Sequence, residues 1–371
     1  MKTIVVSAVN LKVGGTLTIL RNCLQYLSTL SETGDYRIVA LVYKKELAFF
    51  PNITYIEMQW PKKYWINRLW CEYITMRKIS ANLSPVYLWL SLHDTTPSVR
   101  AEKRVVYCHN SFSYYKWKKQ DLIFAPKIVM FALFTNLIYR TNIHENSYIV
   151  VQQEWMKNGF MKSFGIQADT IIIAPPSLSG EKMKELTPEV SSGLRDYVFI
   201  FAATPDSHKN FECICQAAKI VKEQLGIDTF KVYITIKGNE NRYAKWLFRK
   251  WGNGKTNVEF IGYLDRQSLY AYYNQSNCLI FPSKVETWGL PITEFAAFDK
   301  PMLLSDLPYT RETASGCNKV AFFNPDDPYE LAGQMGKLMQ GDTSFLADQE
   351  KKNLPLPVAR SWQELFNILL A

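Results

Sequence analysis

The sequence has no pair of cysteines spaced for zinc binding or redox chemistry. Its seven cysteines are an odd number, they are scattered over 371 residues, and none forms a C-x-x-C pair. The nearest two are Cys213 and Cys215, whose side chains would point about 200° apart on a helix. We therefore interpret all seven as reduced residues of the core or of helices, and we expect a cytoplasmic protein.

The motifs of several enzyme classes are also missing. The chain has no P-loop, no G-x-S-x-G or H-E-x-x-H sequence and no EF-hand loop. It has no compact D-x-D motif that would hold a catalytic divalent ion. Gly14-Gly15, which follows the first predicted strand, falls short of a G-x-G-x-x-G fingerprint but would allow a ligand to approach the backbone closely. We expect neither a metal ion nor a bound cofactor.

Long apolar runs are absent as well. The longest apolar region, residues 122–139, is interrupted by Pro126, Lys127 and Asn136, which argues against a membrane span. The N-terminus enters a predicted strand at residues 3–9 without a basic region followed by an apolar stretch, so no secretory signal is visible.

What the chain does have is positive charge. The net charge is +9, and in the first half the cations alternate with aromatic residues, in KKYW (62–65), RLW (68–70) and YYKWKK (114–119). This mixture suits an anionic membrane, where aromatic rings lie at headgroup level and cations meet phosphates. Nucleic acid could use the same residues, and a plain solvated basic face is the third alternative. We expect the membrane contact and no nucleic-acid partner.

Short apolar runs alternate with helical patterns along nearly the whole chain, which indicates βα units and parallel sheets. A length of 371 residues predicts about two domains. The predicted strands are 3–9, 36–43, 53–58, 86–92, 104–109, 147–152 and 170–174 in the first half, and 197–204, 230–237, 258–262, 278–282, 301–305 and 319–323 in the second.

Each half is thus a doubly wound α/β domain, with helices predicted at 209–225 and 328–340 in the second. The stretch 174–193 is rich in Pro, Ser and Gly and is predicted to connect the two halves. The predicted domains are 1–176, 177–356 and an amphipathic helix at 357–371. Ligands of such folds bind beyond the carboxyl ends of the strands, so two facing domains would present these loops to a shared cleft.

The stretch FPSKVETWGLPITEFAAFDKP (281–301) suggests a binding site. Pro291 suits the first turn of a helix whose predicted N-cap, Leu290, has no side-chain acceptor, so amide groups there are available for an anion such as phosphate. Glu286 and Glu294 would repel a phosphate but accept hydrogen bonds from hydroxyl groups. Hydroxyls on two sides of a phosphate describe a nucleotide sugar. Alternatively, both glutamates simply favour the positive end of the helix dipole.

Further candidates follow other predicted strands. Lys209 is predicted to open a helix after the loop 203–210, where a cation would neutralise a diphosphate. His93-Asp94 and His109-Asn110 follow two strands of the first half and would lie over the cleft. Each histidine is a possible general acid or base, and each is equally well explained as a structural residue.

The residues 281–314, FPSKVETWGLPITEFAAFDKPMLLSDLPYTRETA, resemble the donor-site signature of family 4 retaining glycosyltransferases, which have the GT-B fold of two facing Rossmann-like domains. The Glu-x7-Glu spacing from Glu286 to Glu294 carries this resemblance. It continues in YCHNSFSYY (107–115), SYIVVQQEWMKNGF (147–160), HKNFECICQAAK (208–219) and FNPDDPYELA (323–332), and in the final helix, which in this fold crosses back to the first domain.

The resemblance implies a role for each matching residue. Glu286 would contact the donor sugar near the reacting centre, and Glu294 would bind the ribose hydroxyls. Lys209 would bind the diphosphate. The residues that would lie along the sugar and diphosphate are Thr287, Trp288, Gly289 and Leu290. The selection of base and sugar would involve Gly238, Gly262 and Tyr263. His109 would act near the reacting sugar, and the acceptor side would be lined by Gly14, Gly15, His93 and Asp94. One departure is Thr204, which stands where relatives often have an arginine that pairs with the lysine.

The resemblance also implies a reaction. A sugar, of hexose type, would pass from a nucleotide diphosphate to an acceptor hydroxyl with retention of configuration and without a metal. The acceptor would be a lipid-linked glycan of bacterial surface polysaccharide, O-antigen or capsule, at the inner face of the plasma membrane. A nucleotide-sugar epimerase of the same fold and a non-catalytic protein that binds membranes or anionic polymers are the alternatives.

Overall fold

The computed structural model describes residues 1–176, 196–252, 254 and 256–371, and the chain divides into two compact units. Unit 1 consists of Met1–Ser113, Phe134–Ser177 and Leu354–Ala371, and unit 2 of Tyr114–Leu133 and Leu178–Asn353. Most of the predicted connection, residues 177–193, lies outside the described residues. The predicted domain limits stay predictions, and each unit is described by itself.

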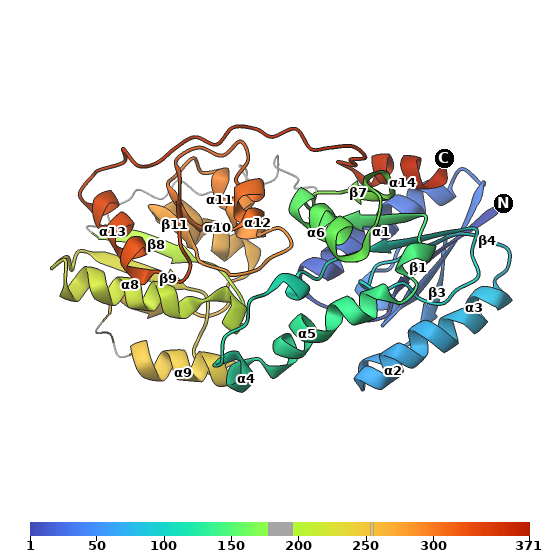
Figure 1. Cartoon of the computed structure of the whole chain (residues 1–371), viewed down its shortest axis with the longest axis horizontal. Coiled ribbons are helices and arrows are strands. Elements are labelled where there is room, and N and C mark those ends of the chain that lie inside the picture. The colour runs from blue at the N-terminus through green and yellow to red at the C-terminus, as the bar shows by residue number, and fades with distance from the viewer. Residues whose placement is uncertain (177–195, 253, 255) are drawn as a thin grey trace. The chain divides into compact units, whose positions relative to one another are not determined.

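Unit 1 is built on a seven-stranded parallel sheet in the order β3-β2-β1-β4-β5-β6-β7 (Figure 1). Its elements are β1 Lys2–Ala8, α1 Gly14–Ser31, β2 Tyr36–Val42, β3 Ile53–Glu57, α2 Trp65–Trp70, a π-helical turn Cys71–Thr75, α3 Met76–Asn82, β4 Val86–Ser91, β5 Lys103–Tyr107, β6 Tyr148–Val151, α6 Glu154–Phe164, β7 Ile171–Ile173 and α14 Trp362–Leu370. The helix α5, Pro126–Arg140, begins in unit 2 and ends in unit 1.

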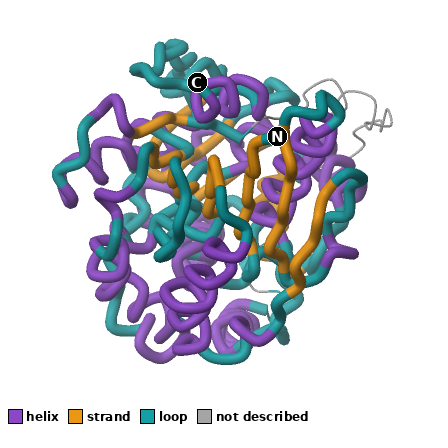
Figure 2. Tube along the Cα trace, turned by 90° about the vertical axis from the view of Figure 1, so that its right-hand side faces the viewer, coloured by secondary structure: helices purple, strands orange, loops and turns teal. Residues whose placement is uncertain are grey.

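The sheet of unit 1 is buried on both faces because its strands are nearly continuous runs of β-branched and other apolar residues. Six of the seven residues of β1 and all six of β4 are buried. Figure 2 shows the strands side by side with helices around them. The stripe Leu17, Leu20, Leu24 and Leu27 of α1 packs into this core.

The C-terminal segment packs on unit 1, as the predicted return of the final helix requires. Tyr26 of α1 stacks on Phe366 of α14, with ring centroids 5.4 Å apart. The helix begins at Trp362, later than the predicted 357, because Val358 forms a bridge with Ile173 of β7 and Ser361 caps the helix through the Glu364 amide.

Unit 2 contains a six-stranded parallel sheet in the order β10-β9-β8-β11-β12-β13. Its elements are α4 Asp121–Phe124, β8 Tyr197–Phe201, α8 Phe211–Glu223, β9 Phe230–Ile234, α9 Arg242–Trp251, β10 Val258–Phe260, α10 Arg266–Gln275, β11 Cys278–Phe281, α11 Leu290–Ala296, β12 Met302–Ser305, α12 Pro308–Thr313, β13 Val320–Phe323 and α13 Pro328–Met339. Together, the two parallel sheets and the returning helix confirm the predicted GT-B fold.

A short segment from the middle of the chain, Tyr114–Leu133, packs on unit 2 (Figure 1). Phe124 of α4 lies against Trp246 of α9, with ring centroids 5.1 Å apart. Gln120 donates a 2.6 Å hydrogen bond to Glu212 of α8, and Lys118 forms a 2.6 Å ion pair with Asp326. The basic and aromatic stretch 114–119 is therefore part of unit 2.

The predicted strands match the observed ones to within three residues at either end. Where a predicted strand is too long, it mostly runs past the carboxyl end of the observed strand. Leu92, Cys108 and Ile236 are examples, since each is fully buried but lies beyond the last residue of its strand. An apolar pattern reports burial, and it continues where the chain has left the sheet to form a loop.

All seven cysteines are buried free thiols, as predicted. No helix among the described residues is long and apolar enough to cross a membrane.

Candidate functional site

Loops at the carboxyl edge of the unit 2 sheet bring Lys209 and Glu286 together. Lys209 follows β8 and Glu286 follows the neighbouring strand β11. Their side chains form an ion pair with 2.5 Å between Nζ and Oε1, and each side chain is 16% exposed. A cation and a carboxylate that are 77 positions apart in the chain thus meet at the edge where ligands of parallel sheets bind.

Lys209 does not open a helix, contrary to the sequence prediction. It ends a short 3-10 turn, Ser207–Lys209, and α8 begins only at Phe211. Between them Asn210 adopts a left-handed conformation, with φ at +60°. Its side-chain amide donates to the carbonyls of Pro282 (3.2 Å) and Pro325 (2.8 Å). Asn210 therefore ties the loop of Lys209 to those that follow β11 and β13, a role that sequence reasoning missed.

The loop that carries Glu286 is fixed through its backbone. The hydroxyl of Tyr309 donates to the Ser283 carbonyl (2.6 Å), and the hydroxyl of Thr313 donates to the Trp288 carbonyl. Gly289 has φ at +89°, and a Cβ atom there would lie 3.2 Å from Ile292 Cδ1. Only glycine suits this position, because other residues would add both backbone strain and a close contact.

The helix that follows differs from its prediction in one detail. The N-cap of α11 is Gly289, and Leu290 is already the first helical residue. Gly289, like Leu290, has no side-chain acceptor, so the helix end is uncapped as expected. Pro291 has no N–H, and the Ile292 amide donates to the Gly289 carbonyl (3.0 Å). This end therefore presents fewer amides to an anion than an ordinary helix does, which increases the importance of Lys209.

Glu294 lies inside α11, so the turn separates it from Glu286. Burial raises the pKa of Glu294, while the charge of Arg266 and a hydrogen bond with Tyr270 act in the opposite direction. Arg266 and Tyr270 belong to α10 and are themselves joined by a 2.9 Å hydrogen bond. The two glutamates thus have different surroundings, one beside a lysine and the other against the start of a neighbouring helix.

Thr204, which stands in place of an arginine, interacts with an acid. Its hydroxyl donates a 2.7 Å hydrogen bond to Asp206 Oδ2. The Lys209 amide donates to the Asp206 carbonyl (2.9 Å), so the loop closes on itself. Since Thr204 brings no charge, Lys209 is the cation that this loop offers to a ligand.

Other predicted donor residues surround this edge. Thr287 and the Trp288 side chain are half-buried. Gly262 has φ at +80°, and the following Tyr263 is 89% exposed, so its ring is available to a ligand. Gly238 has φ at +94°, and a Cβ there would meet the Phe248 Cβ at 2.6 Å and its ring at 2.7 Å. The roles predicted for these residues remain predictions.

The predicted residues of unit 1 lie at the carboxyl edge of its own sheet. Asp94, in a left-handed conformation with φ at +72°, accepts a 2.5 Å hydrogen bond from the His109 amide. The His109 ring stacks on Tyr107 with 4.4 Å between centroids. Burial lowers the pKa of His109, although the nearby Asp94 carboxylate opposes this, so the imidazole is neutral at physiological pH. Gly14 and Gly15 are exposed at the start of α1, after the neighbouring β1.

His93 belongs to a buried polar network. Its Nε2 lies 3.0 Å from Ser7 Oγ and its Nδ1 lies 3.2 Å from Glu72 Oε1. This is the order of groups in a hydrolase triad, but all three residues are 0% exposed, so no substrate reaches the serine. Arg68 completes the network. Its Nε lies 2.8 Å from Glu72 Oε1, and its Nη2 donates a 2.5 Å hydrogen bond to the His93 carbonyl. The geometry favours a structural role for His93.

We expect Glu72→Gln to destabilise unit 1 by about 3 to 5 kcal/mol, because it leaves the buried part of Arg68 without its counter-charge. Burial alone would raise the pKa of Glu72, but Arg68 and His93 outweigh it and lower the pKa to about 2. The stabilisation by the ionised form is therefore present above the usual glutamate pKa and is lost as the pH falls toward 2. Urea unfolding of both proteins between neutral and acidic pH measures the difference.

The matched control is Glu46→Gln, because Glu46 is an exposed glutamate of the same unit. It should unfold like the wild type at every pH. If Glu72→Gln also unfolds like the wild type at neutral pH, the Arg68 pair contributes nothing to stability.

The two groups of residues suit binding chemistry. The carboxyl edge of unit 2 brings together Lys209, two carboxylates in different settings and a backbone turn between them, with Arg266 near Glu294. Among the described residues, no group of three or more His, Cys, Asp or Glu is arranged to hold a metal ion. The prediction that no metal takes part remains a prediction.

Comparisons with known proteins agree with this geometry. Residues 183–353 match the family described as "Glycosyl transferases group 1". The matched region includes every residue that we assign to the carboxyl edge of unit 2, Lys209, Glu286 and Glu294 among them.

A distant relative is the O-antigen chain mannosyltransferase B of Escherichia coli, which is 19% identical over a region that covers 54% of this chain and 55% of that protein. The match thus spans about half the length of this relative.

Two solved structures share the fold of the whole chain. Sucrose-phosphate synthase from Thermosynechococcus elongatus has a TM-score of 0.63 at 13% identity, with 93% of this chain and 91% of that chain covered. HepE from Anabaena in complex with UDP-glucose has a TM-score of 0.61 at 13% identity, with 93% and 92% covered.

Proposed function

We propose that this chain, whose residues 183–353 match the group 1 glycosyl transferase family, transfers a sugar from a nucleotide diphosphate to an acceptor hydroxyl with retention of configuration. The observation that supports this most strongly is the pairing of Lys209 with Glu286 at the carboxyl edge of a parallel sheet, with Glu294 beyond the turn. With this arrangement, Lys209 would be available to a diphosphate, and the sugar and the ribose would each meet one carboxylate, on opposite sides of the turn.

In this proposal the donor lies along residues 286–294. Lys209 binds the diphosphate, Glu286 accepts hydrogen bonds from the sugar hydroxyls, and Glu294 accepts them from the ribose. The charge that develops on the leaving diphosphate is stabilised by a lysine that is already in position, which avoids reorganisation during the reaction. The diphosphate itself is the group that takes the proton of the acceptor hydroxyl.

The acceptor in this proposal is a lipid-linked glycan of a bacterial surface polysaccharide, and the enzyme acts at the inner face of the plasma membrane. The name of the Escherichia coli relative, an O-antigen chain mannosyltransferase, supports this class of product. A hexose donor is proposed on the same ground, and the UDP-glucose bound to HepE supports a nucleotide sugar as the donor.

A panel of nucleoside diphosphates and nucleotide sugars, screened by thermal shift of the full chain, tests the proposal. One nucleotide should raise the melting temperature in a saturable way, since a ligand that binds only the folded state stabilises it. The nucleotide sugar with that base is then incubated with lipid-linked acceptors, and sugar transfer is measured. If no nucleotide shifts the melting temperature, the proposed donor site is wrong.

The two alternatives give different results in the same assays. An epimerase would convert the nucleotide sugar in the absence of any acceptor. A non-catalytic protein that binds anionic polymers would show no nucleotide-specific shift, and its binding would weaken steeply with salt.

A further inference from the structure

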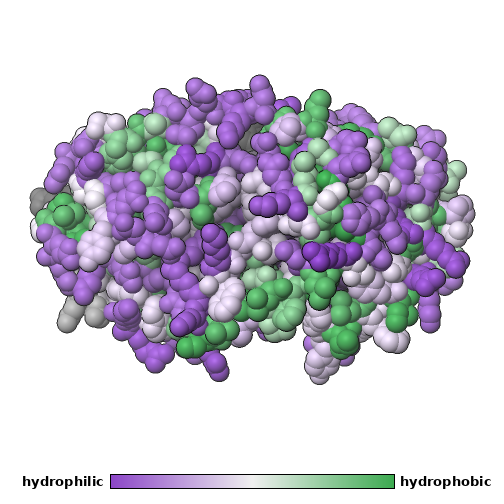
Figure 3. Space-filling model, in the orientation of Figure 1, coloured by the Kyte–Doolittle hydropathy of each residue, from purple (hydrophilic) through white to green (hydrophobic). Residues whose placement is uncertain are grey.

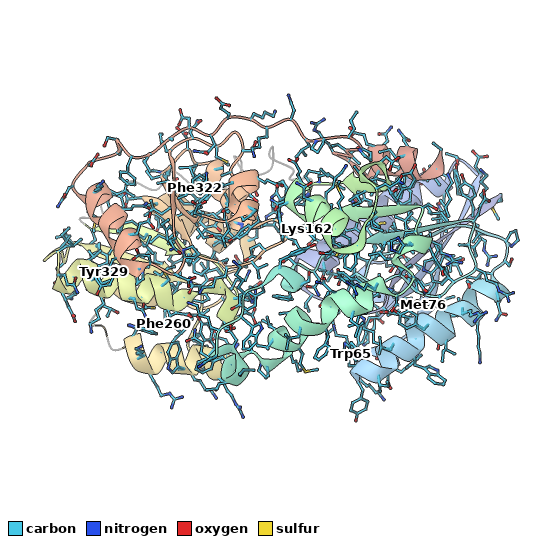
Figure 4. The ribbon with its side chains drawn as sticks, viewed as in Figure 1. Trp65, Met76, Lys162, Phe260, Phe322 and Tyr329 are labelled. Carbon is cyan, nitrogen blue, oxygen red and sulfur yellow. The ribbon has the colours of Figure 1, made fainter. Side chains whose placement is uncertain are left out.

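The helical run from Trp65 to Asn82 in unit 1 has one buried and one exposed face. It is continuous through α2, the π-helical turn and α3. Its inner face holds Cys71, Glu72 and Met76, all of which are fully buried. Figure 4 labels Met76 on the side of the run that faces the sheet and Trp65 at its outer end.

The outer face of this run is apolar. Ile66, Trp70 and Ile74 follow one another at steps of four residues, which places them on one side of a helix. They are 67%, 57% and 37% exposed. Tyr64 and Trp65 extend the surface at the start of the run with 71% and 49% exposure. We call these five residues the apolar stripe. Large apolar groups exposed together mark a contact surface more often than scattered ones do.

The exposed charged side chains between Trp60 and Ala101 all have one sign. Between Trp60 and Ala101 the sequence contains only two acids, Glu72 and Asp94. Glu72 is fully buried, and Asp94 is half-buried and bonded to the His109 amide. The exposed charged residues of the same stretch are Lys62, Lys63, Arg77, Lys78 and Arg100.

The structure also shows which of the basic residues near the apolar stripe can contact a partner. Arg68, which the sequence places among the basic and aromatic residues of this surface, turns inward to Glu72. Lys62 donates to the Asn10 carbonyl (3.0 Å). A shallow groove of about 400 Å³ lies directly beside the stripe, and it is lined by Tyr73, Ile74, Arg77, Lys78, Ala81 and Arg100. Three cations therefore converge where the stripe ends.

We propose that the apolar stripe and this groove form the surface by which the protein docks on an anionic phospholipid bilayer. The stripe enters the headgroup region, where Trp and Tyr side chains of membrane proteins are enriched. The lipid phosphates then lie against Arg77, Lys78 and Arg100. In Figure 3, green and pale residues lie at the lower edge of the molecule over α2, beside strongly hydrophilic ones.

The combination of groups favours a bilayer over the other partners of a basic surface. Nucleic acid uses cations together with aromatic rings on which bases stack, but it gains little from exposed aliphatic side chains such as Ile66 and Ile74. An acidic protein surface would pair with the cations, but its carboxylates would not cover the exposed apolar stripe. A bilayer supplies both kinds of partner, because its phosphates can contact the cations and its apolar layer can take up the stripe.

The surface is separate from the residues assigned to the donor. It belongs to unit 1, whereas Lys209, Glu286 and Glu294 belong to unit 2. The proposal of membrane docking therefore does not depend on the proposed function. Only the idea that docking brings the enzyme to its acceptor rests on the proposed function.

Co-sedimentation of the full chain with vesicles tests this proposal. The protein should bind vesicles of phosphatidylcholine mixed with phosphatidylglycerol, and bind poorly to phosphatidylcholine alone. Trp65→Ser/Ile66→Ser/Trp70→Ser removes most of the apolar stripe and should abolish binding to both. Arg77→Glu/Lys78→Glu should weaken binding to the anionic vesicles by about 600-fold, since each unit of charge near such a surface contributes about fivefold and each reversal changes the charge by two units. Its remaining binding should depend little on salt.

Two control variants make equal changes elsewhere. Lys351→Glu/Lys352→Glu reverses two exposed charges, and Phe49→Ser/Tyr329→Ser/Leu356→Ser removes three exposed apolar side chains. Both should bind vesicles like the wild type, and thermal melting of all variants shows that they are folded. The proposal is overturned if the wild type ignores anionic vesicles, or if the variants of the surface bind as well as the controls do.

Two other outcomes would assign the surface to a different partner. If the wild type is a dimer that the triple serine variant converts to a monomer, and vesicles do not bind, the stripe is an interface between copies. If a single-stranded oligonucleotide binds through the same residues and vesicles do not, the partner is nucleic acid. Glu286→Gln, in contrast, should bind vesicles normally, so failure of sugar transfer and failure of docking are seen separately.

Discussion

Glu286→Gln is expected to lower the rate of sugar transfer by about 1,000-fold, because it removes the carboxylate that is proposed to orient the sugar at the reacting centre. The substitution keeps the size of the side chain and exchanges a charge for an amide. Glu286 lies in a half-buried loop whose shape depends on other groups, namely the Tyr309 and Thr313 hydroxyls and Gly289. The fold should therefore survive. Initial rates of transfer at saturating donor measure the effect.

The control for this variant is Glu259→Gln. Glu259 belongs to the same unit and also pairs with a lysine, Lys231, at 3.2 Å, but it lies on the edge strand β10. It should transfer sugar at the wild-type rate. Transfer by Glu286→Gln within a few-fold of wild type would remove Glu286 from the reaction.

Lys209→Ala is expected to reduce both the affinity for a nucleoside diphosphate and the rate of transfer, each by about 100-fold or more. The reason is that Thr204 adds no charge, Pro291 removes an amide from the helix end, and Lys284, the other lysine of these loops, is paired with Asp326 at 2.6 Å. Calorimetry with the nucleoside diphosphate found in the thermal screen measures the affinity. Lys222→Ala is the control, since Lys222 lies on α8 and pairs with Asp228 at 2.9 Å.

The two variants should differ in how they bind the nucleoside diphosphate. Glu286 forms an ion pair with Lys209, so its carboxylate competes with the diphosphate for that positive charge. Removing the carboxylate should leave the affinity equal or higher, whereas removing the lysine should lower it. An equal loss of affinity in both variants would mean that they disrupt the loop as a whole.

Much of the fold follows from local patterns in the sequence. A strand buried on both faces has to be a run of apolar residues, so most strands of the two sheets are visible as such runs, whereas the edge strands β3 and β10 also carry exposed residues. Turn residues mark the helix beginnings in the same way, with Pro291 just inside α11. Helix limits were predicted less well, since Asn210 and Ser361 set them through side-chain hydrogen bonds or an unusual backbone conformation.

Within the candidate site, the sequence predicted individual residues but not the contacts that join distant loops. Glu286, Gly289 and Glu294 share one stretch, and their spacing carried the family resemblance. The contact of Asn210 with Pro282 and Pro325 could not be foreseen, because it joins loops that are 72 and 115 positions apart. The inward direction of Arg68 could not be foreseen either, because it depends on the buried Glu72 and on the His93 carbonyl, which is 25 positions away.

The sequence by itself thus determined the two parallel sheets, the turn with its two glutamates and the excess of positive charge in the first half. Only the tertiary structure decided which charges are available: Lys209 is paired with Glu286, Arg68 is taken inward by Glu72, and Arg77, Lys78 and Arg100 remain at the surface. The physical reason is that burial and pairing of a charge depend on the fold: Lys209 meets a partner 77 positions away, and Arg68 turns inward because Glu72, although only four residues away, is buried. Apolar periodicity is a local property, but the partner of a charged group is chosen by the fold.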